Sequence, residues 1–171
     1  MRCAPRRPAP PPPLVAVALL PIADQPERSA VTGIFTFYSW IADTRAAVPE
    51  ALATAIRDAL VARGITVVPA RSAGAPTTVR QASDAVAAAH LDTPALFVVI
   101  DRWEAENVTA PQRVDVGLDA TLFAPNGKIL WTTRREAAQL STLNATDLTS
   151  AYRKAAASAA AWLVADWTAA P

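Results

Sequence analysis

The dipeptide Asn126-Gly127 constrains the fold most, because it lies between two stretches of strand-like sequence. From Val114 to Leu122, apolar residues alternate with polar or small ones, and this period of two places one set of side chains on one face of a strand. A second strand-like stretch begins at Lys128. Asn-Gly between such runs predicts a β-hairpin, because both central residues of a type I′ turn need φ > 0 and these two residue types tolerate it best.

The length of this turn decides which side chains face the core. A two-residue loop produces cross-strand pairs that are chemically matched: Leu122 with Trp131, Thr121 with Thr132, and Asp119 with Arg134. A three-residue loop instead pairs Leu122 with Leu130 and turns Ile129 and Trp131 toward the polar face, where they would form a docking patch. The matched pairs favour the two-residue loop, which predicts that Trp131 lies in the core.

A third strand precedes the hairpin. The residues from Leu96 to Ile100 are all apolar, and the polar stretch from Asp101 to Glu104 that follows is typical of a strand leaving a core. Together with the hairpin, this strand predicts an antiparallel three-stranded meander over residues 96–136. Trp103 lies in this polar half of the strand, which is expected to emerge from the core.

The rest of the chain predicts three helices and two buried strands. The helices run from Pro49 toward Gly64, from Thr77 or Thr78 to about His90, and from Asp147 to about Trp167, and the strands cover Leu14–Leu20 and Ile65–Val68. The expected order is therefore β-α-β-α-β-β-β-α. This order is typical of an α/β fold in which a mixed sheet is flanked by helices.

The amino terminus divides the chain into a tail and a domain. Residues 1–13 are rich in proline, which predicts a disordered tether, and residues 14–171 are expected to form a single α/β domain. The apolar run Leu14–Leu20 also has the length of a secretory-signal core, and arginines precede it. The prolines before it, and the lack of a clear cleavage site after it, favour a buried strand. No run approaches the roughly 18 to 20 apolar residues of a membrane-spanning helix.

Composition argues against most kinds of catalytic site. The net charge of +1 offers no basic surplus for nucleic acid or an anionic membrane. One cysteine, Cys3, and one histidine, His90, cannot supply a zinc site, and no glycine-rich nucleotide motif is present. His90 is expected at a helix C-terminus, where it complements the dipole. The acids Asp101, Glu104 and Glu106 are expected to be solvated charges at a strand end. We therefore expect no enzyme, no cofactor and no bound metal.

Large aromatic side chains are the remaining functional signal. Phe35, Phe37, Tyr38 and Trp40 cluster within the stretch 24–40, which is predicted to be a long loop that could include a short edge strand. Trp103 lies on the polar half of its strand. Such side chains pack either against the core, as part of a loop folded over a sheet edge, or against a partner. These five residues are the candidate partner-binding residues.

Several features occur in an order that is similar to a known group of proteins. They are a cysteine before a proline-rich spacer (Cys3, Pro5–Pro13), an apolar strand ending in Leu20-Pro21, Trp40 ahead of an Ala/Leu helix closed by Gly64 and a Val-rich strand, the strand Val98–Glu104, and the hairpin Asn126–Trp131. Together they resemble the small bacterial envelope lipoproteins that serve as auxiliary subunits of transport and secretion systems. This group includes the ABC-type transport auxiliary lipoproteins and relatives that share the fold of the TolB amino-terminal domain.

The resemblance implies a non-catalytic protein of the periplasm or outer membrane that works through contacts with other envelope subunits, and a homo-oligomer is among the expected assemblies. It also implies lipidation at Cys3, although lipoprotein cysteines follow an apolar signal and only Met1-Arg2 precede Cys3 here. The alternative function is a carrier for a small ligand or lipid, with a pocket between a helix and the sheet.

Overall fold

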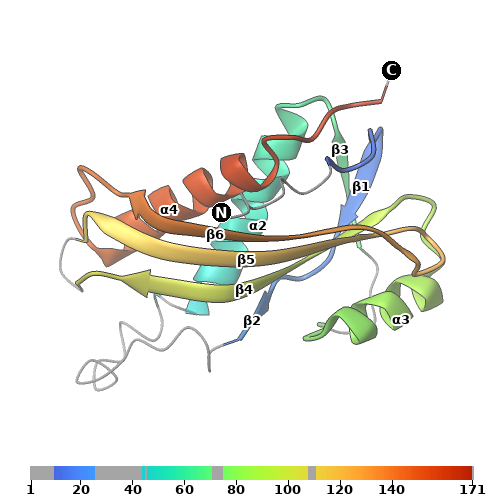
Figure 1. Cartoon of the computed structure of the whole chain (residues 1–171), viewed down its shortest axis with the longest axis horizontal. Coiled ribbons are helices and arrows are strands. Elements are labelled where there is room, and N and C mark those ends of the chain that lie inside the picture. Colours follow the sequence, from blue (N-terminus) through green and yellow to red (C-terminus); the bar gives the residue numbers. More distant parts are fainter. Residues whose placement is uncertain (1–9, 26–43, 45, 71–74, 108–110, 171) are drawn as a thin grey trace, which may run out of the picture.

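One mixed β-sheet organises the part of the chain that the computed structural model describes, residues 10–25, 44, 46–70, 75–107 and 111–170. The elements in chain order are β1 (Ala16–Leu19), β2 (Ala23–Asp24), α2 (Val48–Val61), β3 (Thr66–Pro69), α3 (Val79–Ala89), β4 (Ala95–Ala105), β5 (Arg113–Phe123), β6 (Ile129–Ser141) and α4 (Leu148–Leu163) (Figure 1). The predicted α/β class and order are confirmed, with the two-residue strand β2 as an addition.

The sheet has the strand order β3-β1-β4-β5-β6. Strand β1 is parallel to both β3 and β4, whereas β4, β5 and β6 form the predicted antiparallel meander. Strand β2 continues alongside β4 where β1 stops, with Ala23 opposite Val99. Pro21 lies in the gap between β1 and β2, as expected for a residue that cannot donate a ladder hydrogen bond.

Helices cover the two faces of the sheet unequally. Helices α2 and α4 lie together on one face, and α3 lies against the other face near the end of the β5–β6 hairpin (Figure 1). The larger core lies under α2 and α4, and the smaller core lies under α3. Val17 belongs to the larger core and Ala18 to the smaller one, so β1 is buried on both faces. This burial explains its uninterrupted apolar sequence.

The helix ends lie close to their predicted positions. In α2 the buried side chains follow one stripe, and Gly64 with φ of +78° comes just after the helix. Helix α3 begins where the Thr78 hydroxyl accepts the Gln81 N–H, and it ends at His90, which has φ of 47°. Helix α4 ends at Leu163, before the predicted end near Trp167.

The β5–β6 turn is not the predicted type I′ turn. Gly127 donates its N–H to the Ala124 carbonyl (2.9 Å), and the Ala124 N–H bonds to the Lys128 carbonyl (2.7 Å), which leaves a three-residue loop. Gly127 has the predicted positive φ, +81°, but Asn126 is not among the described residues with positive φ. The ring of Pro125 fixes its own φ at a negative value, which suits the first position of the loop. Gly127 then adopts the left-handed conformation at the end of the loop.

A β-bulge then restores the register that the two-residue loop predicts. Phe123 lies opposite Ile129, but Leu122 lies opposite Trp131, so Leu130 is an additional residue in β6. Beyond the bulge, all three predicted pairs are present, including Thr121 with Thr132. Trp131 is accordingly buried and packs edge-to-face on Trp167, with ring centroids 5.6 Å apart.

Leu14, just after the proline run, bonds to the segment that follows α4. Leu14 donates its N–H to the Thr168 carbonyl (3.1 Å), and the Ala170 N–H returns to the Leu14 carbonyl (3.0 Å), so these two segments lie side by side. Residues 1–9 lie outside the described part, and the division into tether and domain stays a prediction. None of the helices that the structure describes is long and apolar enough to cross a membrane.

We expect Gly127→Ala to destabilise the domain by about 2 kcal/mol or more, because the left-handed conformation alone costs an L-residue roughly 1 to 2 kcal/mol. An added Cβ would also lie 2.6 Å from the Ser83 carbonyl oxygen of α3. Urea unfolding measures the change. The control Asn126→Ala removes only the side-chain hydrogen bond to the Lys128 N–H and should cost much less. Equal stability of Gly127→Ala and the wild type would contradict this account.

The start of α4 predicts a pH dependence. The Ser150 N–H donates to the Asp147 carboxylate (2.7 Å), and this bond, helped by the Thr146 hydroxyl, lowers the pKa of Asp147. A carboxyl whose pKa is depressed by folding stabilises above its ordinary pKa and loses this contribution as the pH falls through its folded pKa. Asp147→Asn keeps a capping oxygen that does not titrate. The loss of melting temperature between pH 6 and pH 3 should therefore be smaller in Asp147→Asn than in the wild type, and an equal loss would contradict the assignment.

Candidate functional site

The structure places Trp103 in the core, so the prediction that it is exposed on the polar half of its strand is wrong. A bulge in β4 sets Ile100 opposite Leu118 and Arg102 opposite Gly117, so the alternation shifts by one residue after Ile100. Trp103 therefore shares the face of Ile100 and is fully buried. Strict alternation could not detect this shift, because an additional residue reverses the face of every side chain that follows it.

Trp103 forms the base of a local aromatic cluster. Its ring packs edge-to-face against Tyr152 of α4, with centroids 5.9 Å apart and an interplanar angle of 88°. Its indole Nε1 is buried and has no hydrogen-bond partner among the described residues. Trp103 therefore supports α4 from below and does not present a surface to a partner.

The other predicted contact residues, Phe35, Phe37, Tyr38 and Trp40, lie outside the described residues, as does Cys3. Their roles in partner binding and lipidation stay predictions.

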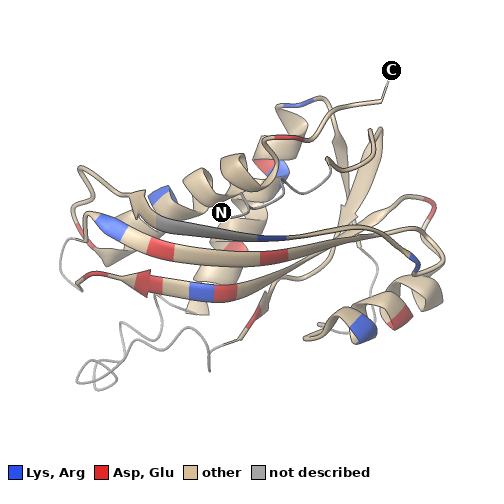
Figure 2. Ribbon diagram, viewed as in Figure 1, with Lys and Arg blue, Asp and Glu red and all other residues tan. Residues whose placement is uncertain are grey.

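Acidic and basic residues lie close together along the strands of the meander (Figure 2), and the acids Asp101, Glu104 and Asp115 are held in ion pairs. Arg102 contacts Glu104 (2.7 Å) and Asp115 (3.2 Å), and Arg134 pairs with the buried Asp101. The Asp115 carboxylate also accepts the Gln139 N–H (2.8 Å) at a second bulge, in β6. Arg102 links β4 to β5 and Arg134 links β6 to β4, so these carboxylates have structural partners.

The remaining acid of this group, Glu106, is also bonded locally. Its carboxylate accepts the Gln112 N–H (2.9 Å) and lies 3.6 Å from Arg113. His90, the one histidine of the sequence, ends α3 on the other face of the sheet from α4 and is exposed. Within the described ranges, no group of three His, Cys, Asp or Glu side chains could hold a metal ion.

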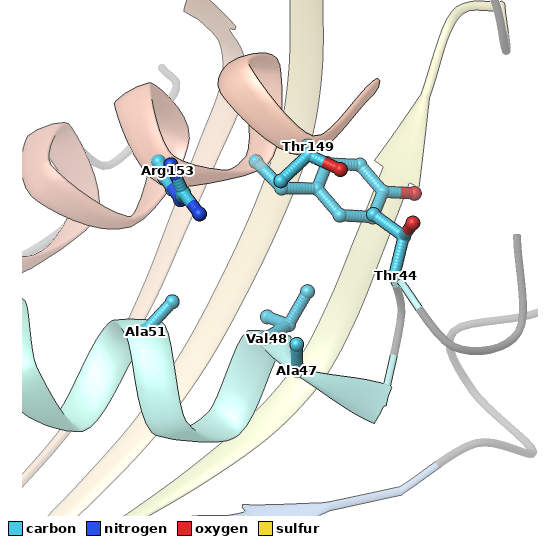
Figure 3. A pocket seen from close by; sticks show the side chains of 7 residues that line it. Thr44, Ala47, Val48, Ala51, Thr149 and Arg153 are labelled. Carbon is cyan, nitrogen blue, oxygen red and sulfur yellow. The ribbon is translucent and has the colours of Figure 1, made fainter. Parts of the chain in front are cut away.

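A groove between the first turns of α2 and α4 is the best candidate site. Its volume is about 290 Å³, it is open on one side, and it is lined by Thr44, Ala47, Val48, Ala51, Thr149, Tyr152 and Arg153. Figure 3 shows side chains from both helices around this space, with Arg153 on the α4 side and Ala51 on the α2 side. Among the described lining residues, most are apolar, and Arg153 is the one that carries a charge.

The groove forms because the small side chains of Ala47 and Ala51 leave space above the buried side chains of Val48 and Tyr152. Val48 and Tyr152 are buried, and Tyr152 rests on Trp103. Ala47 and Ala51 project too little to fill the space between the helices. A second hollow beside it is lined by Glu50, Thr54 and Arg153 together with the same alanines. This arrangement can bind an apolar group that carries or adjoins a charge.

Sequence reasoning missed this groove. It placed Tyr152 in the buried stripe of α4 and Arg153 off that stripe, which is correct for both residues. The groove also depends on where α2 crosses α4, and no periodicity within one helix specifies that crossing.

Comparison with solved structures identifies the fold. A PelC dodecamer from Paraburkholderia phytofirmans is 15% identical, covers 96% of this chain and 97% of its own, and superposes with a TM-score of 0.57. The chain shares the PelC fold. A substituted PelC dodecamer from the same organism gives 15% identity, coverage of 94% and 96%, and a TM-score of 0.54. Lipoprotein GNA1162 from Neisseria meningitidis is 17% identical, with coverage of 89% and 99% and a TM-score of 0.40. No protein family and no curated protein matches the sequence.

The position of Trp103 predicts the effect of its removal. We expect Trp103→Ala to destabilise the domain by roughly 3 to 5 kcal/mol, because it leaves a large cavity under Tyr152. Trp103→Phe keeps an aromatic ring and removes the unpaired N–H, so it should cost less. Chemical denaturation followed by circular dichroism tests both variants. A wild-type melt for Trp103→Ala would mean that the ring is not core.

Proposed function

We propose that this chain is a non-catalytic module of the bacterial cell envelope that assembles with copies of itself and acts through protein contacts. The observation that carries the proposal is the match to PelC, which spans nearly all of both chains and belongs to a protein solved as a dodecamer. A match over the whole length leaves little room for an added catalytic domain within these 171 residues.

The described surface supports association more than chemistry. Charged residues on the open face of the sheet are paired with one another, and the described lining of the groove combines an apolar floor with the Arg153 guanidinium. Tyr and Arg, which the groove contains, are residue types that are enriched at binding hot spots. The lining residues that the structure describes include no histidine, cysteine or serine that could act as a base or nucleophile.

The sequence resemblance supports the finer parts of the proposal. By that resemblance the module lies in the periplasm, is anchored to the outer membrane through Cys3, and serves as an auxiliary subunit of a transport or secretion system. Phe35, Phe37, Tyr38 and Trp40 would contact the other envelope subunits, because loop aromatics are favoured at such interfaces. Trp103 is excluded from this set by its burial.

A carrier of a small ligand or lipid is the second candidate, and the apolar groove is the observation that favours it. A volume of about 290 Å³ is near the lower limit for ligand sites. The groove is also open on one side, whereas carriers enclose most of the ligand surface. Its shape therefore suits an inserted side chain better than a lipid.

Self-association is the direct test. The mass of the purified chain, measured by light scattering across a range of concentrations, should rise from the 18.0 kDa of a monomer to one defined larger species. The measurement uses a reducing buffer, and Cys3→Ser serves as the control for disulfide-linked dimers. A monomeric mass at every concentration would contradict the proposal.

A further inference from the structure

The last turn of α2 presents an apolar side chain between two opposite charges. Val61 is 57% exposed, although it is a large aliphatic residue. Arg57 and Asp58 precede it by four and three residues, so both lie beside it on the helix surface. Both are exposed, and neither forms an ion pair with a described residue.

The groove at the other end of α2 has the complementary chemistry. Its apolar floor suits an aliphatic side chain. Arg153 lies on its α4 side, Glu50 lines the hollow beside it, and neither forms an ion pair within the described ranges. Arg153 is therefore opposite in charge to Asp58, and Glu50 is opposite in charge to Arg57.

Other exposed aliphatic side chains lack this match. Ile129 and Leu130 follow Lys128 in β6, Val79 precedes Arg80, and the Leu143 carbonyl accepts a hydrogen bond from Lys154. Val15 precedes β1 and has no charged residue beside it in sequence.

We propose that the α2–α4 groove binds Val61 of the partner subunit, with Arg153 facing Asp58 of the partner subunit and Glu50 facing Arg57 of the partner subunit. The partner is a second copy of this chain, so the inference rests on the proposed self-association and names its interface. Insertion removes apolar surface from water on both sides, and the charge pairs orient the two copies.

The positions of the two patches determine the type of assembly. About ten residues of α2 separate them, which is about 15 Å at the rise of an α-helix. Because different patches meet, the contact is heterologous, and repeating it gives a ring if the rotation closes. A closed ring has a defined number of subunits, which agrees with one defined species in solution.

Charge reversal tests the pairing. Arg153→Glu and Asp58→Arg, each alone, should raise the apparent dissociation constant of self-association by at least about tenfold, because like charges then meet at every contact. An equimolar mixture of the two variants places opposite charges at every contact and should assemble like the wild type, as should the double variant. Val61→Ser changes no charge and should also weaken assembly.

Two controls reverse charges away from the groove and should assemble normally. Lys154→Glu changes the next residue of α4, whose amine reaches the Leu143 carbonyl, and Asp84→Arg changes α3. Unchanged circular dichroism melts show that each variant folds, and Arg153→Gln replaces Arg153→Glu if that variant does not. Single variants that assemble normally would overturn this interface and leave self-association standing. A mixture that stays impaired would overturn the pairing. A monomeric wild type would overturn both proposals.

Discussion

The bulge in β4 is the constraint on which the rest of the structure depends. It brings Ile100 and Trp103 to one face of the sheet and turns Asp101 and Arg102 to the other. The residue opposite Arg102 is Gly117, where an added Cβ would lie 3.1 Å from the Arg102 Cβ. Because glycine has no Cβ, Gly117 allows the backbones of β4 and β5 to lie close together at the bulge. Without this shift, Trp103 would face the open side and the core under α4 would lose its largest side chain.

The bulge that follows the β5–β6 turn acts in the same way on β6. The additional residue Leu130 restores the register after the turn, so that Trp131 points into the core. Trp103 and Trp131 then support α4 at its two ends. Trp103 packs on Tyr152 near the start of the helix, and Trp131 packs on Trp167 beyond its end. Edge-to-face contacts of this kind add to the free energy of burial and orient the rings.

The position of α4 connects the core to the candidate site. Tyr152 is the floor of the groove and is held by Trp103, while the next residue, Arg153, reaches the solvent at its rim. The same turn of α4 thus packs against the core through Tyr152 and reaches the surface through Arg153. An interface built on such a rigid support loses little conformational freedom when it forms, which favours binding.

The sequence by itself determined the elements and their class. Periodicity located the meander and the helices, Asp147 and Thr78 marked helix starts, and the glycine of Asn126-Gly127 marked the turn, because these signals act over a few residues. The cross-strand pairs also predicted that Trp131 is buried, whereas only the tertiary structure decided the face of Trp103 and the existence of the groove. A bulge depends on how neighbouring strands pair, and a groove depends on where two distant helices cross, so neither is encoded in the period of one segment.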